Sequence, residues 1–114
     1  MVFPKRKYAR HAVAVEVEAQ LHGDAAEGAS LVFDSVDLGL GGMFLRSELL
    51  LEVGDELDLA IWLPGYEAPL LAMGRVAWVA RLVDLKGQPG MGVSFTKMDR
   101  DTQAVLSGFL AGQP

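Results

Sequence analysis

Two arginines near the start of the chain, Arg6 and Arg10, stand four positions apart in the segment KRKYARH. On an extended or loosely turning segment, two guanidinium groups at this spacing can converge on one multivalent anion. A guanidinium suits this task because its planar fork pairs two acceptors at once, and a guanine edge offers such a pair in O6 and N7. The alternative interpretation of the same motif is a solvated basic tail.

A second group of residues follows further along the chain, where Asp37 precedes three glycines within four residues in the segment DLGLGGMF. Glycines this dense indicate tight turning, or close approach of the backbone to another group. The carboxylate of Asp37 could accept hydrogen bonds from guanine N1–H and N2–H2. The alternative is a β-turn that the Asp37 side chain caps.

Positive charge is concentrated at the beginning of an otherwise acidic chain. Lys5, Arg6, Lys7 and Arg10 are four of the ten basic residues, while the formal net charge is -5. Such acidity argues against a nonspecific DNA binder, which normally spreads Lys and Arg over a whole face. Four cations in one arm still act locally, because salt screens charges beyond about 8 to 10 Å. We therefore interpret residues 1–11 as a flexible basic arm.

The composition predicts one globular domain over residues 12–114, since 51% of the residues are hydrophobic and 22% are charged. No apolar run approaches the roughly 20 residues that cross a bilayer, and no apolar segment follows the basic start as in a cleaved signal peptide. Cysteine is absent, which excludes disulfides and is compatible with the cytoplasmic location that we expect.

Neither a metal site nor catalytic chemistry is expected. The two histidines, His11 and His22, have no cysteine and no ligand spacing around them. No nucleophile is accompanied by a base and a third, orienting group. We therefore predict no metal, no catalytic residue and no enzymatic activity.

Alternating apolar residues predict a mainly β fold. The segment HAVAVEVEAQL has the period of two that is typical of a strand with one solvated face, and further strands are expected in SLVFDSVDL, MFLRSEL, GDELDLAIWLP and GMGVSF. The long run PLLAMGRVAWVARLVDL could be a helix, but its β-branched residues and Gly74 favour a strand. Short strands with glycine turns indicate a small closed barrel or a sandwich. Trp62 and Trp78 are expected in its core or at a barrel end, although one exposed ring could stack on a base.

The last segment, MDRDTQAVLSGFL, changes to the period of a helix. Asp99 is a suitable N-cap, and the apolar residues that follow recur at helical spacing: Val105, Leu106, Phe109 and Leu110. We predict one C-terminal helix at about 99–110, with its apolar stripe across an open end or a face of the barrel.

The motif R-x-x-x-R before the first strand, followed by Asp-x-x-x-x-Gly about thirty residues later, resembles the paired motifs of the PilZ domain family. The segments GDELDLAIWLP, GRVAWV, GMGVSF and DRDTQAVLSGFL look like that family's later strands and terminal helix, in the same order. The resemblance covers roughly Lys5 to Leu110. It implies a six-stranded antiparallel β-barrel with a C-terminal α-helix, and binding of the bacterial second messenger cyclic di-GMP without a cofactor.

The resemblance also implies roles for single residues. Arg6 and Arg10 match the arginines that hold the phosphates and guanines of the ligand. Asp37 matches the acidic or Asn position that reads a guanine edge, and Gly42 matches the glycine that closes the second motif. Gly39 stands where the family pattern Asp/Asn-x-Ser-x-x-Gly has its serine. Additional candidate contacts are Lys7, His11 and Gly41.

We therefore expect a non-catalytic receptor that binds cyclic di-GMP and relays the signal to a protein partner, as a monomer or a homodimer. Glycine in place of serine weakens binding by about tenfold at most in this estimate, because a neutral hydrogen bond contributes only about 0.5 to 1.5 kcal/mol. One alternative is a degenerate PilZ-fold adaptor that binds a protein but no nucleotide. Another is a small barrel that binds single-stranded nucleic acid through the arm and an exposed tryptophan, although the acidity argues against DNA or RNA binding.

Overall fold

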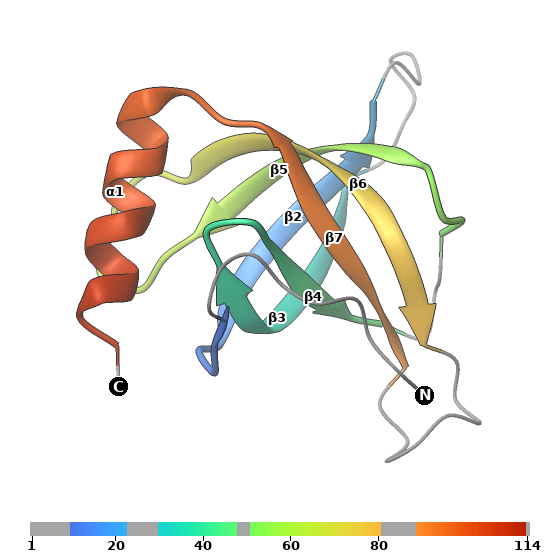
Figure 1. Cartoon of the computed structure of the whole chain (residues 1–114), viewed down its shortest axis with the longest axis horizontal. Helices are drawn as coiled ribbons and strands as arrows, with labels where there is room; N and C mark the ends of the chain where they lie inside the picture. The colour runs from blue at the N-terminus through green and yellow to red at the C-terminus, as the bar shows by residue number, and fades with distance from the viewer. Residues whose placement is uncertain (1–9, 23–29, 48–50, 81–88, 114) are drawn as a thin grey trace.

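A computed structural model describes residues 10–22, 30–47, 51–80 and 89–113, which form one sheet closed into a barrel with a helix against one end of it (Figure 1). In chain order the elements are β1 (Arg10–His11), β2 (Val15–Leu21), β3 (Leu31–Gly39), β4 (Gly42–Arg46), β5 (Glu56–Trp62), β6 (Leu70–Ala80), β7 (Gly90–Lys97) and α1 (Arg100–Ala111). The long apolar run therefore forms a strand, β6, as its β-branched residues favoured.

The strands follow the order β1-β3-β2-β5-β6-β7-β4, and every neighbouring pair is antiparallel. A further antiparallel pairing of β3 with β4 closes the ring, so that β2 to β7 form a six-stranded barrel. The short strand β1 lies outside this closed ring, on the edge of β3. The predicted fold class, a six-stranded antiparallel barrel with a C-terminal helix, is confirmed.

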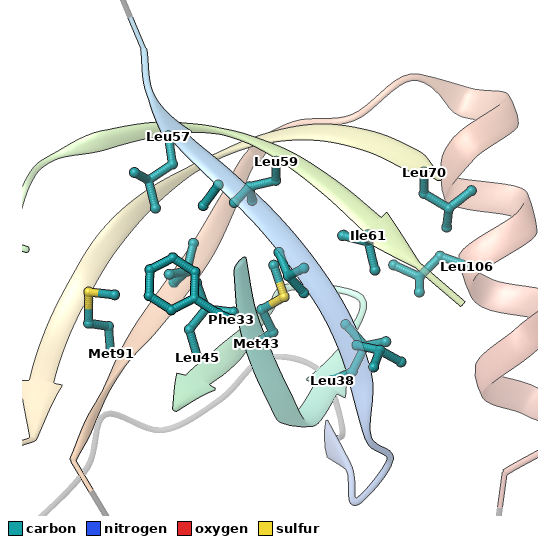
Figure 2. Packing of buried hydrophobic residues seen from close by; sticks show 14 of the residues in the cluster. Phe33, Leu38, Met43, Leu45, Leu57, Leu59, Ile61, Leu70, Met91 and Leu106 are labelled. Atoms are coloured by element: carbon teal, nitrogen blue, oxygen red, sulfur yellow. The ribbon is translucent and has the colours of Figure 1, made fainter. Parts of the chain in front are cut away.

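Side chains from alternate strand positions fill the barrel. On β2, Val15, Val17 and Ala19 are buried while Glu16 is exposed, which is the alternation expected from the sequence. Figure 2 shows the larger members of this core converging from all sides of the barrel. Those it labels are Phe33, Leu38, Met43, Leu45, Leu57, Leu59, Ile61, Leu70, Met91 and Leu106.

The helix α1 covers one end of the barrel with the apolar stripe that its sequence predicts. Leu106 and Leu110 are buried, and Figure 2 shows Leu106 turned toward Leu70 and Ile61. Asp99 is the N-cap, as expected, and its Oδ1 accepts the Thr102 N–H at 2.8 Å. This hydrogen bond holds the pKa of the Asp99 carboxyl below its ordinary value, because it favours the charged form. Within the described ranges, no helix has the length and apolar character needed to span a membrane.

Both tryptophans face outward from the barrel, so neither side chain lies in the core, which was one of the positions expected for them. Trp62 is half-buried, and its Nε1–H donates to Glu18 Oε1 at 2.9 Å. Trp78 is also half-buried and stacks on Phe44, with 5.5 Å between the ring centroids. The position of Trp78 has a specific cause in the register of β6, which is described below.

Candidate functional site

The first strand brings the two sequence motifs together. Arg10 of β1 pairs with Gly39 of β3, and His11 pairs with Leu38. β2 pairs with β3 only as far as Ser35, so β1 takes the part of the same β3 edge that β2 leaves open. The second arginine of R-x-x-x-R therefore lies one strand spacing, about 4.8 Å, from the glycine-rich motif. Arg6 and Lys7 lie outside the described residues.

The glycine-rich motif forms the hairpin between β3 and β4. Asp37 is half-buried near the end of β3 and pairs with Phe44, while Gly39 is buried as the last residue of that strand. Gly41 lies in the turn, where its carbonyl oxygen accepts the Phe95 N–H at 2.9 Å. All the candidate residues that the structure describes thus gather at this hairpin: Arg10, His11, Asp37, Gly39, Gly41 and Gly42.

Gly42 is required for close approach between strands. It opens β4 and pairs with Ser94 of β7. A Cβ on Gly42 would overlap the carbonyl oxygen of Val93 and would lie 3.1 Å from Ser94 Cα. Every atom it would meet belongs to the backbone of the neighbouring strand, so no side-chain rotation can make room. The close approach expected for the motif is therefore confirmed at this glycine.

A β-bulge in β3 turns Asp37 away from the core. Ser35 pairs with Leu45, but the next pair is Asp37 with Phe44, so two residues of β3 oppose one of β4. Phe33 and Ser35 point inward, and simple alternation would direct Asp37 inward as well. The extra residue shifts the alternation by one, with the result that Leu38 is fully buried and Asp37 faces outward.

Ser35 spans this bulge with its side chain. It is the one buried polar residue in the part of the chain that the structure describes, with 0% of its surface exposed. Its hydroxyl donates to the carbonyl oxygen of Asp37 at 3.1 Å. A buried hydroxyl needs such a partner, and this one ties the two ends of the bulge together. Ser35 thereby holds the backbone of Asp37 in its outward orientation.

A second bulge acts in the same way on β6. Val76 pairs with Val93, and the next pair is Trp78 with Gly92, so Ala77 is the extra residue. The inward positions before the bulge are even-numbered and end at Val76, which is fully buried. Beyond it, Val79 pairs with the buried Met91, so Trp78 faces outward.

The two bulges place Asp37 and Trp78 in one line across the outer face. Asp37 pairs with Phe44, Phe44 pairs with Gly92, and Gly92 pairs with Trp78. We call these four residues, from β3, β4, β7 and β6, the outer row. A Cβ on Gly92 would overlap the Trp78 indole, and one on Gly90 would overlap the Phe44 ring. The two rings therefore lie directly on the backbone of β7.

Ion pairs flank the outer row on both sides. On one side of the outer row, Arg46 Nη2 lies 3.5 Å from Asp34 Oδ2. On the other side, Arg75 Nη2 lies 2.8 Å from Glu56 Oε2. The hydrogen bond from Arg75 holds the pKa of the Glu56 carboxyl below its ordinary value. These exposed pairs contribute little to stability, but they make the surface beside the rings polar.

The chemistry that this surface supports is recognition of a ligand. A carboxylate, two aromatic rings and an arginine-bearing strand offer hydrogen-bond acceptance, stacking and cationic contact to a planar, anionic ligand. Among the described residues, no group of three or more His, Asp or Glu side chains could hold a metal ion.

Sequence reasoning missed Ser35 and Phe44 as parts of the candidate site, and it offered Trp78 only as one of two rings that could stack on a base. Period-two alternation gives no sign of a bulge. One signal was present in the segment GMGVSF. Gly90 and Gly92 stand two positions apart and so lie on the same face of a strand. Two glycines on one face leave a bare strip of backbone, which aromatic side chains from neighbouring strands can cover.

The sequence profile of the PilZ domain matches residues 4–112, and the chain therefore belongs to the PilZ domain family. No curated protein matches it in sequence.

Several solved structures share this fold. The Bacillus subtilis inhibitor of motility MotI/DgrA aligns with a TM-score of 0.75 at 18% identity, covering 96% of this chain and 51% of that protein. The PilZ domain of Escherichia coli YcgR, solved with c-di-GMP (cyclic di-GMP), aligns with a TM-score of 0.71 at 19% identity, covering 96% and 92%. The MrkH–c-di-GMP complex from K. pneumonia aligns with a TM-score of 0.72 at 18% identity, covering 96% and 52%. The chain thus spans about half the length of MotI/DgrA and MrkH.

Proposed function

We propose that this chain is a receptor for cyclic di-GMP, and that it passes the signal to a protein partner without catalysing a reaction. The observation that carries the proposal is the pairing of β1 with β3, which sets Arg10 beside Gly39 in the second motif. Membership of the PilZ family supports it, as do the relatives YcgR and MrkH, which were solved with this nucleotide.

Each candidate residue has a proposed role. Arg6 and Arg10 pair with the phosphates and guanine acceptors, because a guanidinium meets both bidentately. Asp37 accepts from a guanine N1–H and N2–H2, and its outward orientation suits that contact. Gly39 and Gly42 provide the backbone surface of the hairpin that lies beside the ligand. Lys7, His11 and Gly41 are proposed as supplementary contacts.

The proposed signal is ordering of the basic arm, residues 1–11, on the single domain formed by residues 12–114. Within the arm, Arg10 and His11 are already paired with β3. The positive charges of the arm repel one another, and a dianionic nucleotide removes this repulsion where it bridges the arm and the hairpin. The ordered arm then offers a new surface to the partner. We propose a cytoplasmic location for this receptor.

Titration calorimetry with cyclic di-GMP tests the binding directly, with the linear dinucleotide pGpG as the control. We expect saturable binding of the cyclic ligand and weaker binding of the linear one, because only the ring presents both phosphates in a fixed arrangement. Absence of any heat or melting-temperature shift at millimolar cyclic di-GMP would refute the receptor proposal.

A PilZ-fold adaptor that binds no nucleotide is the second candidate, and Gly39 is the residue that favours it. The hydroxyl of the family's serine is missing here, while the rest of the motif and its pairing with β1 are present. The calorimetric test separates the two functions, because the adaptor predicts no nucleotide binding under any condition.

Restoring the serine with Gly39→Ser is expected to tighten cyclic di-GMP binding by about two- to tenfold, the equivalent of one neutral hydrogen bond. The matched control is Gly108→Ser on α1, where an added Cβ meets nothing within 4 Å outside the neighbouring helix backbone, and it should leave the affinity unchanged. Calorimetry on both variants provides the comparison. If Gly39→Ser abolishes binding instead, the hairpin depends on glycine there and the proposed role of this position is incorrect.

Replacing Ser35 by alanine is expected to lower the free energy of unfolding by about 1 kcal/mol, since one buried hydrogen bond is lost. It should also weaken cyclic di-GMP binding by about threefold or more, because the bulge no longer holds Asp37. Val17→Ala, a truncation in the core of β2, is the control: it should destabilise at least as much without changing the affinity of the folded protein. Equal affinities of Ser35→Ala and the wild type would show that Ser35 does not position Asp37.

A further inference from the structure

Two large apolar side chains that the barrel leaves in water lie in one lateral row, away from the hairpin. Val32 on β3 is 62% exposed, and Leu71 on β6 is 65% exposed. Val32 pairs with Glu18 of β2. Glu18 pairs in turn with Ala60 of β5, and Ala60 pairs with Leu71. The row therefore crosses four neighbouring strands on the outside of the barrel.

Trp62 adds an aromatic ring to the same surface. It stands two residues after Ala60 on β5, so both side chains face outward. Its Nε1–H donates to Glu18 Oε1 at 2.9 Å, which fixes the half-buried indole against β2. Glu16 is the register partner of Trp62 on that strand. Because Ala60 has a small side chain, an apolar side chain of a partner can pack over it, between Leu71 and the indole.

Negative charge accompanies these apolar residues. Within the part of the chain that the structure describes, the carboxylates of Glu16 and Glu18 form no ion pair, whereas Arg46, Arg75 and His22 at the border are each paired with another carboxylate. The surface therefore combines exposed apolar groups with two uncompensated negative charges. We call it the β2–β5 face, and its members are Glu16, Glu18, Val32, Ala60, Trp62 and Leu71.

We propose that the β2–β5 face docks a basic protein partner, through a segment in which Lys or Arg side chains flank an exposed apolar one. The apolar side chain packs on Leu71 and Ala60, and the cations pair with Glu16 and Glu18. Charge complementarity favours this occupant, because nucleic acid and anionic lipid have the same sign as the face. A second copy of the chain would bring the same negative charges to a symmetric contact.

This face lies opposite the candidate nucleotide site. In the closed ring β2 stands opposite β7 and β5 opposite β4, while the hairpin and the middle of the outer row belong to β4 and β7. Partner and nucleotide therefore do not compete. The inference rests on the proposed function for what docking achieves, since ordering of the arm would then act on a partner that is already attached. Docking itself is expected with and without cyclic di-GMP.

A synthetic peptide, Lys-Ser-Leu-Ser-Lys-Ser-Leu-Ser-Lys, is the probe for this surface. In an extended peptide alternate side chains point the same way, so its lysines and leucines can face the protein together. Nuclear magnetic resonance of the isotope-labelled full chain measures the titration. We expect saturable shift changes at the Trp62 indole N–H and at the amides of Val32 and Leu71. Control peptides with serine for leucine, or glutamate for lysine, should bind about fivefold more weakly or less.

Leu71→Ser and Glu16→Gln are each expected to weaken binding of the peptide by about threefold or more. The matched controls are Val53→Ser and Glu52→Gln in the turn before β5, where Val53 is 61% exposed and Glu52 is exposed as well. Both should bind the peptide as the wild type does. All four side chains lie in water, so the variants should keep the wild-type circular dichroism spectrum and a loss of binding reports docking.

Equal weakening by Leu71→Ser and Val53→Ser, or equal binding of the leucine-free peptide, would overturn the docking surface. A dimer in analytical ultracentrifugation that Leu71→Ser dissociates would overturn it in favour of a second copy of the chain. Binding to phosphatidylglycerol vesicles that the same variant removes would overturn it in favour of a membrane.

The outcomes also separate this inference from the proposed function. Peptide binding at the β2–β5 face without any calorimetric response to cyclic di-GMP would support the docking surface and refute the receptor. Normal binding of cyclic di-GMP without binding of the peptide would refute the docking surface and leave the receptor intact.

Discussion

Gly42→Ala is expected to lower the free energy of unfolding by about 3 kcal/mol, the upper part of the usual range for an overpacked site. The added Cβ overlaps the Val93 carbonyl oxygen and comes within 3.1 Å of Ser94 Cα. β4 can move away from β7 only by breaking its pairing with that strand, which extends from Gly42–Ser94 to Arg46–Gly90. This pairing is one of those that close the barrel. Chemical denaturation monitored by circular dichroism measures the loss.

Gly108→Ala is the control for this prediction. An added Cβ at Gly108 meets nothing within 4 Å outside the neighbouring helix backbone, and alanine is a better helix former than glycine by up to about 1 kcal/mol. The control should therefore unfold at the same or a slightly higher denaturant concentration. An unfolding free energy of Gly42→Ala equal to that of the wild type would show that the close approach of β4 to β7 is not needed.

Removal of either arginine of R-x-x-x-R is expected to cause the largest loss of cyclic di-GMP affinity. Arg6→Ala and Arg10→Ala should each weaken binding by about ten- to a hundredfold, since a hydrogen bond to a charged group contributes about 1.5 to 3 kcal/mol. The affinity falls because phosphate oxygens or guanine acceptors of the bound nucleotide then have no arginine to pair with. Calorimetry under conditions of equal salt measures both variants and the double variant.

Arg100→Ala is the matched control, because Arg100 is an exposed arginine at the start of α1. It removes one positive charge from the chain, as the test variants do, so it accounts for the general effect of charge on an anionic ligand. Its affinity should stay within about twofold of the wild type, since long-range effects are screened by salt. Wild-type binding by the double variant Arg6→Ala/Arg10→Ala would refute the proposed site.

Local patterns in the sequence were sufficient for most of the architecture. The alternation in β2, the β-branched residues of β6 and the helical spacing after Asp99 predicted the type of each element, and the structure agrees with all three. These features are predictable because they depend on neighbouring residues along one segment. The paired motifs likewise indicated the PilZ family, which the sequence profile confirms.

The composition of the candidate site was predicted only in part. Asp37 was singled out by its carboxylate beside the glycines, and Gly39 and Gly42 by the resemblance to the PilZ family; β1 brings Arg10 to them in space. Ser35 was missed, because alternation along SLVFDSVDL does not by itself say which residue leaves it. Trp78 was expected in the core or at a barrel end, with an exposed ring as the alternative. Alternation alone did not decide between these, because Trp78 continues the even-numbered inward positions of β6 until Ala77 interrupts them.

The sequence by itself therefore determined the kinds of elements, their order and the residue types at the hairpin, since these follow from local periodicity and side-chain chemistry. Only the tertiary structure decided that β3 and β4 close the barrel, that β1 lies beside the hairpin, and that Asp37, Phe44 and Trp78 share one face. The physical reason is that strand register and bulges depend on hydrogen bonds to a partner strand. A partner strand lies far away in the chain, so no single segment contains that information.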